Sequence, residues 1–376
     1  MNASSLFKRE LTRGRRKKPA GANGGGFGRA KELVGLKVGA SHVGAAVVAN
    51  NGGPHLVKVA REQLAAGVVT GGEVREPEAL ATALDAFFRK HDLPRRNVRL
   101  GVGSNRIGVR IFERPGVDDP QQLANAIRFR AHEALPIPIE EAMLDYHLVD
   151  DLEGPGRVLL AVTYRDLIDR FMLACAEAKL QLVGIDLEAF ALLRALARPS
   201  SDPAERRDAA LVAVSIGHDR TAIAVSDGRL CEFVRVLEWG GDTLTGAIEE
   251  ALGVERAQAE AIKHSLSLLP TSSSSEAETD GKAHDAVRRK LESLARELVS
   301  SLEFYQAQPT ALAIAEIMLT GGTSEIPGLD DELQRLTGIR VRIADPFVRV
   351  TGGRAAFGDG AAGSLTVPIG LGIEDR

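Results

Sequence analysis

The sequence predicts an α/β protein made of two similar lobes, with a small α+β subdomain inserted into the first. Its 376 residues exceed the length that one hydrophobic core usually supports, so two domains are expected. A strand–turn–strand pattern occurs twice, 178 positions apart, near the start of each half of the chain. Strands and amphipathic helices alternate after both copies, which is typical of sheets covered by helices.

The repeated pattern has the composition of a β-hairpin. The first copy runs from Leu33 to Gly39 and from Ser41 to Val48, and the second from Leu211 to Gly217 and from Asp219 to Val225. Each has apolar strand residues, a glycine at the bend and small polar residues after it, as a hairpin requires. Five residues are identical at the 178-position offset. The spacing favours an internal duplication over the alternative, chance similarity between two apolar hairpins.

The first half continues with an extended run, a helix and a short strand. The run is His55–Gln63 and the strand is Asn97–Gly103. A helix is predicted over Pro77–His91, because proline suits a first helical turn. Four apolar residues also fall on one face of it, namely Leu80, Leu84, Phe87 and Phe88.

The inserted subdomain is predicted at residues 107–185, which leaves residues 31–106 and 186–208 to the first lobe. Helices and strands mix within it, as in a compact α+β module. Strands are expected at Ile107–Glu113, Met143–Val149, Arg157–Thr163 and Leu180–Asp186, and helices at Pro120–Ala134 and at 165–178.

The second lobe is predicted at residues 209–376. A Ser/Thr/Glu-rich stretch makes residues 265–284 a predicted flexible loop. The other expected elements are the strand Leu230–Leu237, a helix opening near Asp242, helices Glu255–Leu268 and Asp285–Gln308, the strand Glu316–Thr320, the helix Leu329–Leu336, the strand Arg340–Ile343 and a small-residue helix or turn at Ala361–Gly372.

The composition argues against several classes of protein. A net charge of −4 is unlike that of a dedicated nucleic-acid binder, whose binding face is basic. The sequence has no uninterrupted apolar run of about 18 residues and no apolar core of a signal peptide in its first 30 residues. Cys175 and Cys231 are too few for a disulfide framework and lie far from other ligand residues, so packed thiols and no metal site are expected.

The first 30 residues form a basic segment, which contains Lys8, Arg9, Arg13, Arg15, Arg16, Lys17 and Lys18. One interpretation is a disordered, solvated tail. The other is adhesion to anionic lipid, worth about 1 kcal/mol per basic residue near the surface. The second interpretation predicts a protein that works close to a membrane.

Two hairpins and a late Gly-Gly turn can hold a nucleotide between two lobes. Glycine lets the backbone approach a phosphate closely, so Gly39 with Ser41 would contact it from one side, and Gly217 with Thr221 from the other. Two glycine pairs add to this arrangement, Gly240-Gly241-Asp242-Thr243 at a helix start and Gly321-Gly322-Thr323 after an apolar strand. Asp242 is a suitable N-cap there, and the helix could present N–H groups to an anion. A flat adenine could lie against Gly321 and Gly322.

Further motifs follow one another through both halves. They are Leu135–Glu141 ahead of Leu144–Tyr146, Gly240–Thr245, Ala259–Lys263, Leu302–Tyr305, Leu319–Thr323 through to Leu329, and Thr337–Ile339 followed by Asp345–Phe347. In this order they resemble the actin-like ATPase superfamily and, within it, the PilM family of type IV pilus assembly proteins, which is related to the cell-division protein FtsA. The resemblance covers residues 33–372. It implies an actin-like, ribonuclease H-like duplicated fold, in which the insert replaces the second small subdomain of actin.

The resemblance also implies a cofactor and a partner. The cofactor would be ATP or ADP, with Glu260 and Lys263 flanking the nucleoside from one helix face; the alternative for this pair is an ordinary solvated face. The partner would be the N-terminal peptide of a PilN-like membrane protein, held between the first lobe and the insert. The protein would then be cytoplasmic, peripheral to the inner face of the cell membrane, and able to form oligomers.

Two residues depart from the pattern of the family, which has Asp at the end of the first strand of each hairpin to order Mg²⁺. This chain has Lys37 and Ser215 there. Each unit charge at about 4 Å is worth roughly 4 kcal/mol at an effective dielectric constant of about 20, and Mg²⁺ prefers carboxylate oxygens, so the two changes argue against a metal. Lys37 could instead replace Mg²⁺ as the counter-ion of a phosphate, or point to solvent.

Three functions follow as hypotheses. The first is a scaffold with weak or degenerate nucleotide binding and no catalytic residues. The second is a working ATPase or small-molecule kinase, which would need the metal that Lys37 and Ser215 disfavour. The third is an FtsA-like filament anchor, for which the tail ending at Arg376 offers no amphipathic helix.

Overall fold

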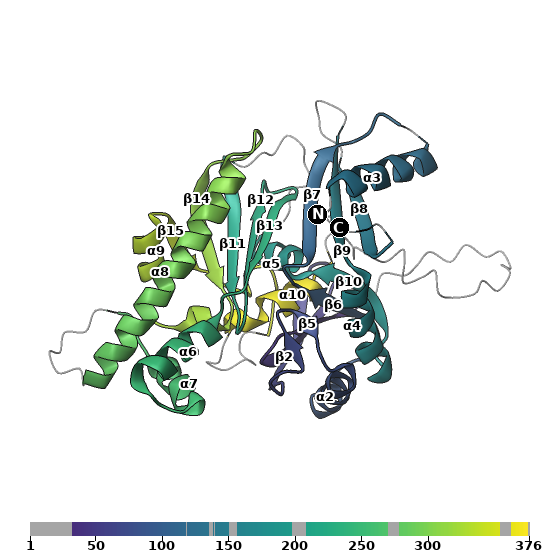
Figure 1. Cartoon of the computed structure of the whole chain (residues 1–376). Helices are drawn as coiled ribbons and strands as arrows, with labels where there is room; N and C mark the ends of the chain where they lie inside the picture. The colour runs from purple at the N-terminus through teal and green to yellow at the C-terminus, as the bar shows by residue number, and fades with distance from the viewer. Residues whose placement is uncertain are drawn as a thin grey trace.

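Two five-stranded sheets, one in each lobe, form the framework of the protein (Figure 1). The computed structural model describes residues 32–117, 119–134, 138, 140–149, 156–197, 208–269, 278–353 and 362–374. The predicted basic tail of residues 1–30 lies outside these ranges, as do residues 270–277 of the predicted loop. Helices lie on both sheets, so the α/β prediction is confirmed.

The first sheet has the strand order β10-β6-β1-β2-β3. Its three antiparallel strands are consecutive in sequence, whereas β6 runs parallel to β1 and β10 runs parallel to β6. The bounds are β1 Glu32–Val38, β2 His42–Ala49, β3 His55–Gln63, β6 Val98–Val102 and β10 Leu182–Leu187.

The second sheet has the same plan, in the order β13-β12-β11-β14-β15. Here β11, β12 and β13 form the antiparallel part, and β14 and β15 add in parallel. The bounds are β11 Ala210–Ile216, β12 Thr221–Ser226, β13 Cys231–Leu237, β14 Ile314–Thr320 and β15 Arg340–Ile343.

The predicted duplication is confirmed by strand register. In the first hairpin Val34 pairs with Val47, and in the second Val212 pairs with Val225. Both members of the pair are therefore displaced by the same 178 positions, in strands that occupy equivalent places in their sheets.

The inserted subdomain has a sheet of its own, in the order β7-β9-β8. The strands are β7 Ile107–Glu113, β8 Ala142–Val149 and β9 Arg157–Tyr164, and the helix α3 Pro120–Ala134 packs on them through Leu123 and Ile127. The fourth predicted strand lies elsewhere: β10 pairs with β6 in the first sheet. The helix α4, Arg165–Glu177, likewise packs on α2 of the first lobe, Pro77–Lys90. A continuous apolar run does not tell which sheet a strand joins.

The remaining helices of the second lobe are α6 Gly241–Leu252, α7 Arg256–Ser265, α8 Glu278–Gln306 and α9 Leu329–Thr337. α8 begins inside the segment predicted as the loop 265–284, seven residues before the predicted helix start at Asp285. Ala283 and Val287 explain this, because both are buried in the core of the second lobe. A short hairpin, β4 Val69–Thr70 with β5 Glu73–Val74, completes the first lobe.

Two helices join the lobes by crossing between them (Figure 1). α5, Glu188–Leu196, follows the last strand of the first sheet but packs on β11 and β12 of the second. α10, Thr366–Gly372, follows the second lobe but packs on β1 and β2 of the first. The helices also contact each other, so closely that a Cβ on Gly370 would lie 1.9 Å from the carbonyl oxygen of Ala191.

Buried polar groups fix these crossing helices. Arg194 of α5 forms a buried ion pair with Asp186, at 2.8 Å, and donates to the carbonyl of Gly370 at 2.9 Å. Arg99 of β6 donates to the carbonyls of Leu371 and Ile373 at 3.1 and 3.0 Å. Buried charges are tolerated when they are paired in this way.

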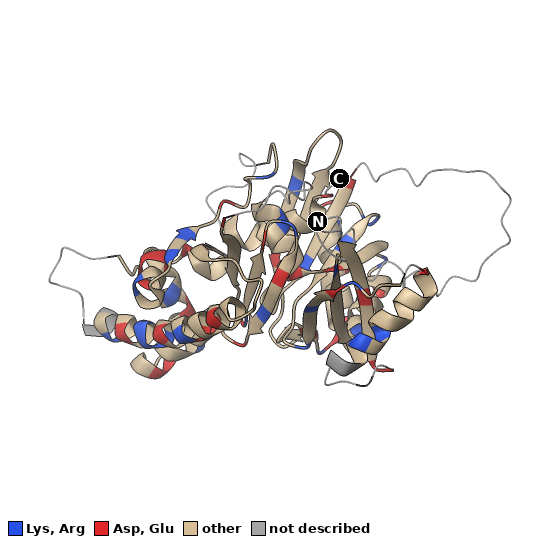
Figure 2. Ribbon diagram, turned by 90° about the horizontal axis from the view of Figure 1, so that it is seen from above, with Lys and Arg blue, Asp and Glu red and all other residues tan. Residues whose placement is uncertain are grey.

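The surface is charged but mixed. Figure 2 shows Lys and Arg interspersed with Asp and Glu along the helices, as the small net charge leads one to expect. None of the helices in the described ranges combines the length and the apolar character needed to cross a bilayer.

Candidate functional site

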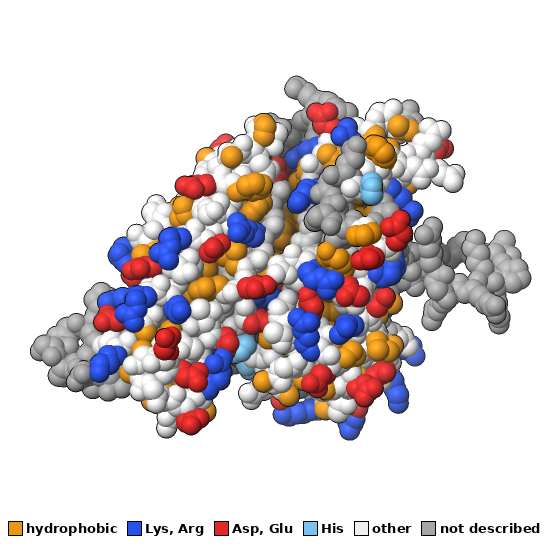
Figure 3. Space-filling model, viewed as in Figure 1, with side chains coloured by type: hydrophobic (Ala, Val, Ile, Leu, Met, Phe, Trp, Pro, Cys, Tyr) orange, Lys and Arg blue, Asp and Glu red, His pale blue; other side chains and the backbone are white. Residues whose placement is uncertain are grey.

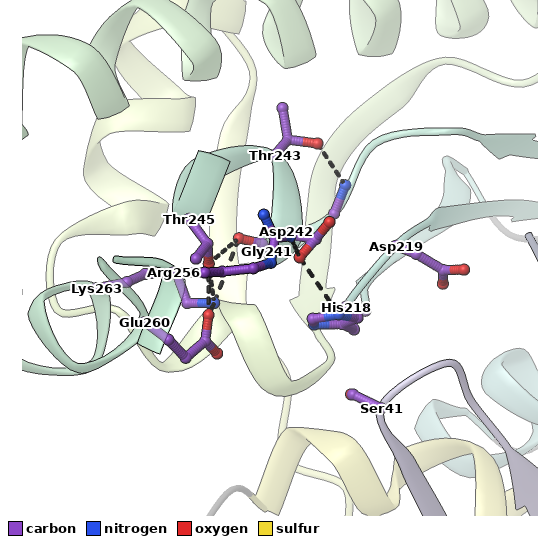
Figure 4. Close-up of polar contacts among 12 residues, drawn as sticks. Ser41, His218, Asp219, Gly241, Asp242, Thr243, Thr245, Arg256, Glu260 and Lys263 are labelled. Atoms are coloured by element: carbon purple, nitrogen blue, oxygen red, sulfur yellow. Dashed lines mark hydrogen bonds and ion pairs between the residues drawn. The ribbon is translucent and has the colours of Figure 1, made fainter. Parts of the chain in front are cut away.

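The turns of the two duplicated hairpins face each other where the lobes meet. Each turn closes with the same hydrogen bond: Gly39 N–H donates to His42 O at 2.9 Å, and Gly217 N–H donates to Arg220 O at 2.9 Å. Figure 4 shows Ser41 of the first turn across from His218 and Asp219 of the second. The duplication therefore brings the predicted pair of turns together at one site.

The glycine pair at the start of α6 supports the second turn. Gly241 N–H donates to Gly217 O at 2.9 Å, and Asp242 N–H donates to His218 O at 2.7 Å. A Cβ on Gly240 would lie 2.3 Å from His218 O, so this position requires glycine. The prediction differs here, because Gly240 and not Asp242 is the N-cap, and two of the N–H groups expected to face an anion already bind carbonyls.

The side chain of Asp242 instead contacts two basic side chains beside the second turn. It forms an ion pair with Arg256 of α7 and lies 3.4 Å from His218 Nε2 (Figure 4). Thr243 Oγ1 accepts a hydrogen bond from Gly240 N–H at 3.4 Å. The helix start is thus held by side chains as well as by backbone.

Glu260 and Lys263 meet on one face of α7, as their spacing predicts. Lys263 Nζ lies 2.6 Å from Glu260 Oε2, and it donates to Thr245 Oγ1 at 2.8 Å and to Gly241 O at 3.3 Å. Burial alone would raise the pKa of Glu260, but hydrogen bonds from Lys263 and Thr245 outweigh burial and lower it. The Lys263 side chain is buried, so the pair is more than a solvated helix face.

The late glycine turn closes over the second hairpin. Gly321 has φ of +97°, and a Cβ there would lie 2.3 Å from Ile216 O, so both conformation and space require glycine. A short 3₁₀ helix, η1 Gly322–Glu325, follows, and Thr323 Oγ1 donates to Gly217 O at 2.9 Å. A Cβ on Gly322 would meet no atom within 4 Å, which leaves open space at this turn.

Thr221 does not take the predicted place. Its hydroxyl is buried and donates to Trp239 O at 2.7 Å, so it is not free to donate to a phosphate. The residue that corresponds to Ser41 at the duplication offset is Asp219, which accepts a hydrogen bond from Gly71 N–H of the first lobe at 2.7 Å. The offset itself was the signal that could have identified Asp219.

Lys37 and Ser215 occupy equivalent strand positions but differ in surroundings. Lys37 Nζ lies 3.5 Å from Glu188 Oε2, and Arg220 Nη2 lies 3.2 Å from Glu188 Oε1. Lys37 therefore does not simply point to solvent. Ser215 is buried. Glu188, the first residue of α5, was absent from the predicted site because no helix was predicted over Glu188–Leu196.

The carboxylate of Glu188 is not free to bind a divalent metal. Both oxygens of Glu188 already face a cation, Lys37 on one side and Arg220 on the other. In the described ranges no cluster of three or more acidic, His or Cys side chains could hold a metal ion.

A family profile and a solved structure both relate this chain to the same family. A family profile described as type IV pilus assembly protein PilM matches residues 35–358. The solved structure of a PilM–PilN type IV pilus biogenesis complex is similar at 26% sequence identity and a TM-score of 0.75, over 91% of this chain and 98% of that chain.

Two more distant structures share the fold. The ethanolamine utilization protein EutJ from Carboxydothermus hydrogenoformans is 17% identical, with a TM-score of 0.54, over 92% of this chain and 90% of that chain. MreB 5 of Spiroplasma citri bound to AMPPNP is 12% identical, with a TM-score of 0.53, over 91% of this chain and 95% of that chain. At these identities the likeness is one of fold alone.

Proposed function

The chain belongs to the PilM family of type IV pilus assembly proteins and has the actin-like fold, and on this premise we propose that it is a cytoplasmic scaffold that docks the N-terminal tail of a PilN-like inner-membrane protein. The similarity to a PilM–PilN complex over nearly the full length of both chains is the observation that carries the proposal. We place the groove between the first lobe and the insert, and expect nucleotide binding to be weak or degenerate.

The ion pairs of Glu188 support the scaffold over an active ATPase or kinase. A phosphoryl-transfer enzyme needs a divalent metal to neutralise the phosphates. Lys37 and Arg220 surround the buried carboxylate instead, and Ser215 supplies no charge at the equivalent position. We therefore infer that ATP or ADP binds without significant hydrolysis and with little effect of Mg²⁺.

The partner is tested with the N-terminal peptide of the neighbouring PilN-like protein, titrated into the full chain. A short peptide buries little area and must become ordered on binding, so a dissociation constant on the order of micromolar is expected. Two aromatic residues of equal exposure provide a probe and a control: Phe129 on α3 of the insert is 63% exposed, and Phe304 on α8 is 64% exposed. Phe129→Ser should weaken peptide binding, and Phe304→Ser should not.

No peptide binding together with measurable ATP hydrolysis would instead establish the enzyme. Calorimetry with and without Mg²⁺ separates the two, because strongly metal-dependent, submicromolar ATP binding contradicts the degenerate site. Lys37→Asp with Ser215→Asp should then raise the dependence of ATP binding on metal. An FtsA-like filament would appear as ATP-dependent polymerisation in light scattering.

The basic tail of residues 1–30 is proposed to hold the protein at the inner face of the membrane. Its attraction to vesicles with anionic lipid should fade as salt rises, because salt screens charges beyond about 10 Å at 0.1 M. Removing residues 1–30 should abolish vesicle binding and leave peptide affinity unchanged. Equal vesicle binding by both chains would refute the membrane role.

A further inference from the structure

A row of four residues crosses the first sheet beside its hairpin turn. Strand register places Gly101, Lys37, Gly44 and Arg61 side by side, on β6, β1, β2 and β3 in turn. Side chains that lie opposite one another in neighbouring strands share a face of the sheet. A Cβ on Gly44 would contact Pro368 of α10, so the row faces the crossing helices and the second lobe. Two cations thus flank a glycine on this face.

Arg61 carries a charge that its surroundings leave partly unsatisfied. Its Nε atom is buried and has no hydrogen-bond partner within the described residues. Burial lowers the pKa of the guanidinium, and the carboxylate of Glu325 on η1 opposes the shift. The guanidinium nevertheless stays charged, because arginine does not lose its proton in proteins. A buried donor without a partner is rare and indicates a missing ligand or water.

Two histidines belong to the facing turns of the two lobes, where Figure 4 shows His218 across from Ser41. His42 is on the same face of the sheet, two residues before Gly44, and its Nδ1 is 2.9 Å from Ser41 Oγ. His218 belongs to the second turn and lies 3.4 Å from Asp242. Histidine atoms reach the surface where the lobes meet (Figure 3).

We propose that Arg61, His42 and His218 bind the phosphate groups of a nucleoside polyphosphate without a divalent cation, and that protons taken up by the two imidazoles replace the charge of the metal. The inference rests on the proposed retention of the nucleotide site. It adds the residues that bind the phosphates, and the protonation that this binding requires. Guanidinium and imidazolium groups are strong donors to phosphate oxygens.

The direction of the pH effect follows from the groups around His42. Burial lowers its pKa to about 4, and Arg61 on β3, His218 on the second turn and His264 on α7 act in the same direction, against Glu260 on α7. His42 is therefore neutral at neutral pH. A bound polyanion reverses this balance and favours the charged imidazole, so binding takes up protons and strengthens as the pH falls.

The test is calorimetry of ATP binding to the full chain in EDTA, at about pH 6 and about pH 8. We expect binding to be roughly tenfold tighter at the lower pH for each imidazole that becomes charged. Repeating the titration in buffers of different ionisation enthalpy counts the protons taken up. Adenosine and inorganic tripolyphosphate separate the contribution of the nucleoside from that of the phosphates.

Variants assign the effect to residues. Arg61→Gln should weaken ATP binding at least about tenfold at both pH values, and Arg61→Lys should weaken it less. The double variant His42→Gln with His218→Gln should take up fewer protons than the unmodified chain. Titration of the ATP phosphates is common to all variants and cancels in this comparison. Arg128→Gln and His132→Gln, both exposed on α3, are the matched controls.

Three results would overturn the inference. They are no ATP binding in EDTA at the lower pH, equal affinity of Arg61→Gln and Arg128→Gln, and equal proton uptake by the double variant and His132→Gln. The PilN-like peptide is titrated in parallel. Peptide binding without ATP binding would reject the phosphate site and leave the scaffold intact, whereas the opposite result would reject the scaffold.

Discussion

The two lobes have the same hairpin but use it differently. In the second lobe the turn is enclosed by hydrogen bonds: Gly241 and Thr323 both donate to the carbonyl of Gly217, and Lys263 joins α6 to α7 nearby. In the first lobe the corresponding face has glycines on both sides of Lys37 and leaves Arg61 Nε without a partner. A duplicated backbone can therefore be kept while one copy becomes a rigid support and the other keeps unsatisfied charge. The first lobe is accordingly where a ligand should change the most.

The largest expected effect is that of Glu188→Leu, which breaks the contact between the lobes. Glu188 is buried and balances Lys37 of the first lobe and Arg220 of the second. Removing one partner of a buried ion cluster typically costs about 3–5 kcal/mol. Urea denaturation should show that loss, and Glu297→Leu, at an exposed pair with Arg235, should change stability by less than about 1 kcal/mol. Equal losses would show that Glu188 does not hold the lobes together.

Lys263→Met tests the rigidity of the second lobe. It removes the cation that lowers the pKa of Glu260 and takes away the donor of Thr245 Oγ1 in α6. We expect a loss of about 2–3 kcal/mol. Since the folded-state pKa of Glu260 is lowered, its contribution is present above the unfolded value of 4.5 and is lost as the pH falls through the folded value. The variant should therefore lose less stability on acidification than the unmodified chain, as measured by thermal unfolding between about pH 6 and pH 3.

Gly240→Ala tests the tight contact that supports the second turn. The added Cβ would lie 2.3 Å from His218 O, so backbone must move, at a cost of about 1–3 kcal/mol. Gly39→Ala in the first turn should cost less, because its Cβ would lie 3.2 Å from His42 O. Gly246→Ala, inside α6 with open space around it, should stabilise by about 0.5–1 kcal/mol. If the second turn is the more enclosed one, the denaturation midpoint must be lowest for Gly240→Ala, higher for Gly39→Ala and highest for Gly246→Ala.

The smallest effect is expected for His42→Gln. The lowered pKa of His42, about 4, means that the unfolded chain binds more protons between pH 4 and the ordinary value of 6.5. Stability is therefore lost as the pH falls through this window. The variant should lose less stability over this pH range, and its midpoint of thermal unfolding at about pH 5 should differ by a few degrees at most. A larger loss in the variant would contradict the lowered pKa.

Strand and helix positions in the outer parts of the fold could be predicted closely, because one face of each element is apolar. β3, β7, α3 and β15 have the predicted bounds. α5 was missed, since all nine of its residues are buried and a short, fully buried helix cannot be told from a buried strand by periodicity alone. Glu188 was missed for the same reason, because its role depends on ion pairs with Lys37 and Arg220 elsewhere in the chain.

The candidate site was predicted in part. Order and spacing brought the turns, the glycine pairs and Glu260 with Lys263 to one place, because these are properties of strands and of helix periodicity. Thr221 was misjudged, since the direction of a side chain at the start of a strand depends on the register of β12, which the sequence does not specify alone. Arg61 was missed because it lies 17 positions from Gly44 in sequence and meets it only through strand pairing.

The crossing of α5 and α10 sets an order in which the molecule can be completed during synthesis. β1 and β2 emerge from the ribosome early, yet the helix that covers their inner face, α10, follows only after the whole second sheet has been made. Gly35 of β1 can pack against Pro368 only after α10 has been made. The contact is tight, because a Cβ on Gly35 would lie 2.0 Å from the carbonyl oxygen of Pro368. Until then the apolar residues of that face, Ala46 and Val48, stay uncovered, which invites chaperone binding or aggregation. The two lobes therefore mature together, and a half produced alone would expose the surface that its counterpart supplies a helix to cover.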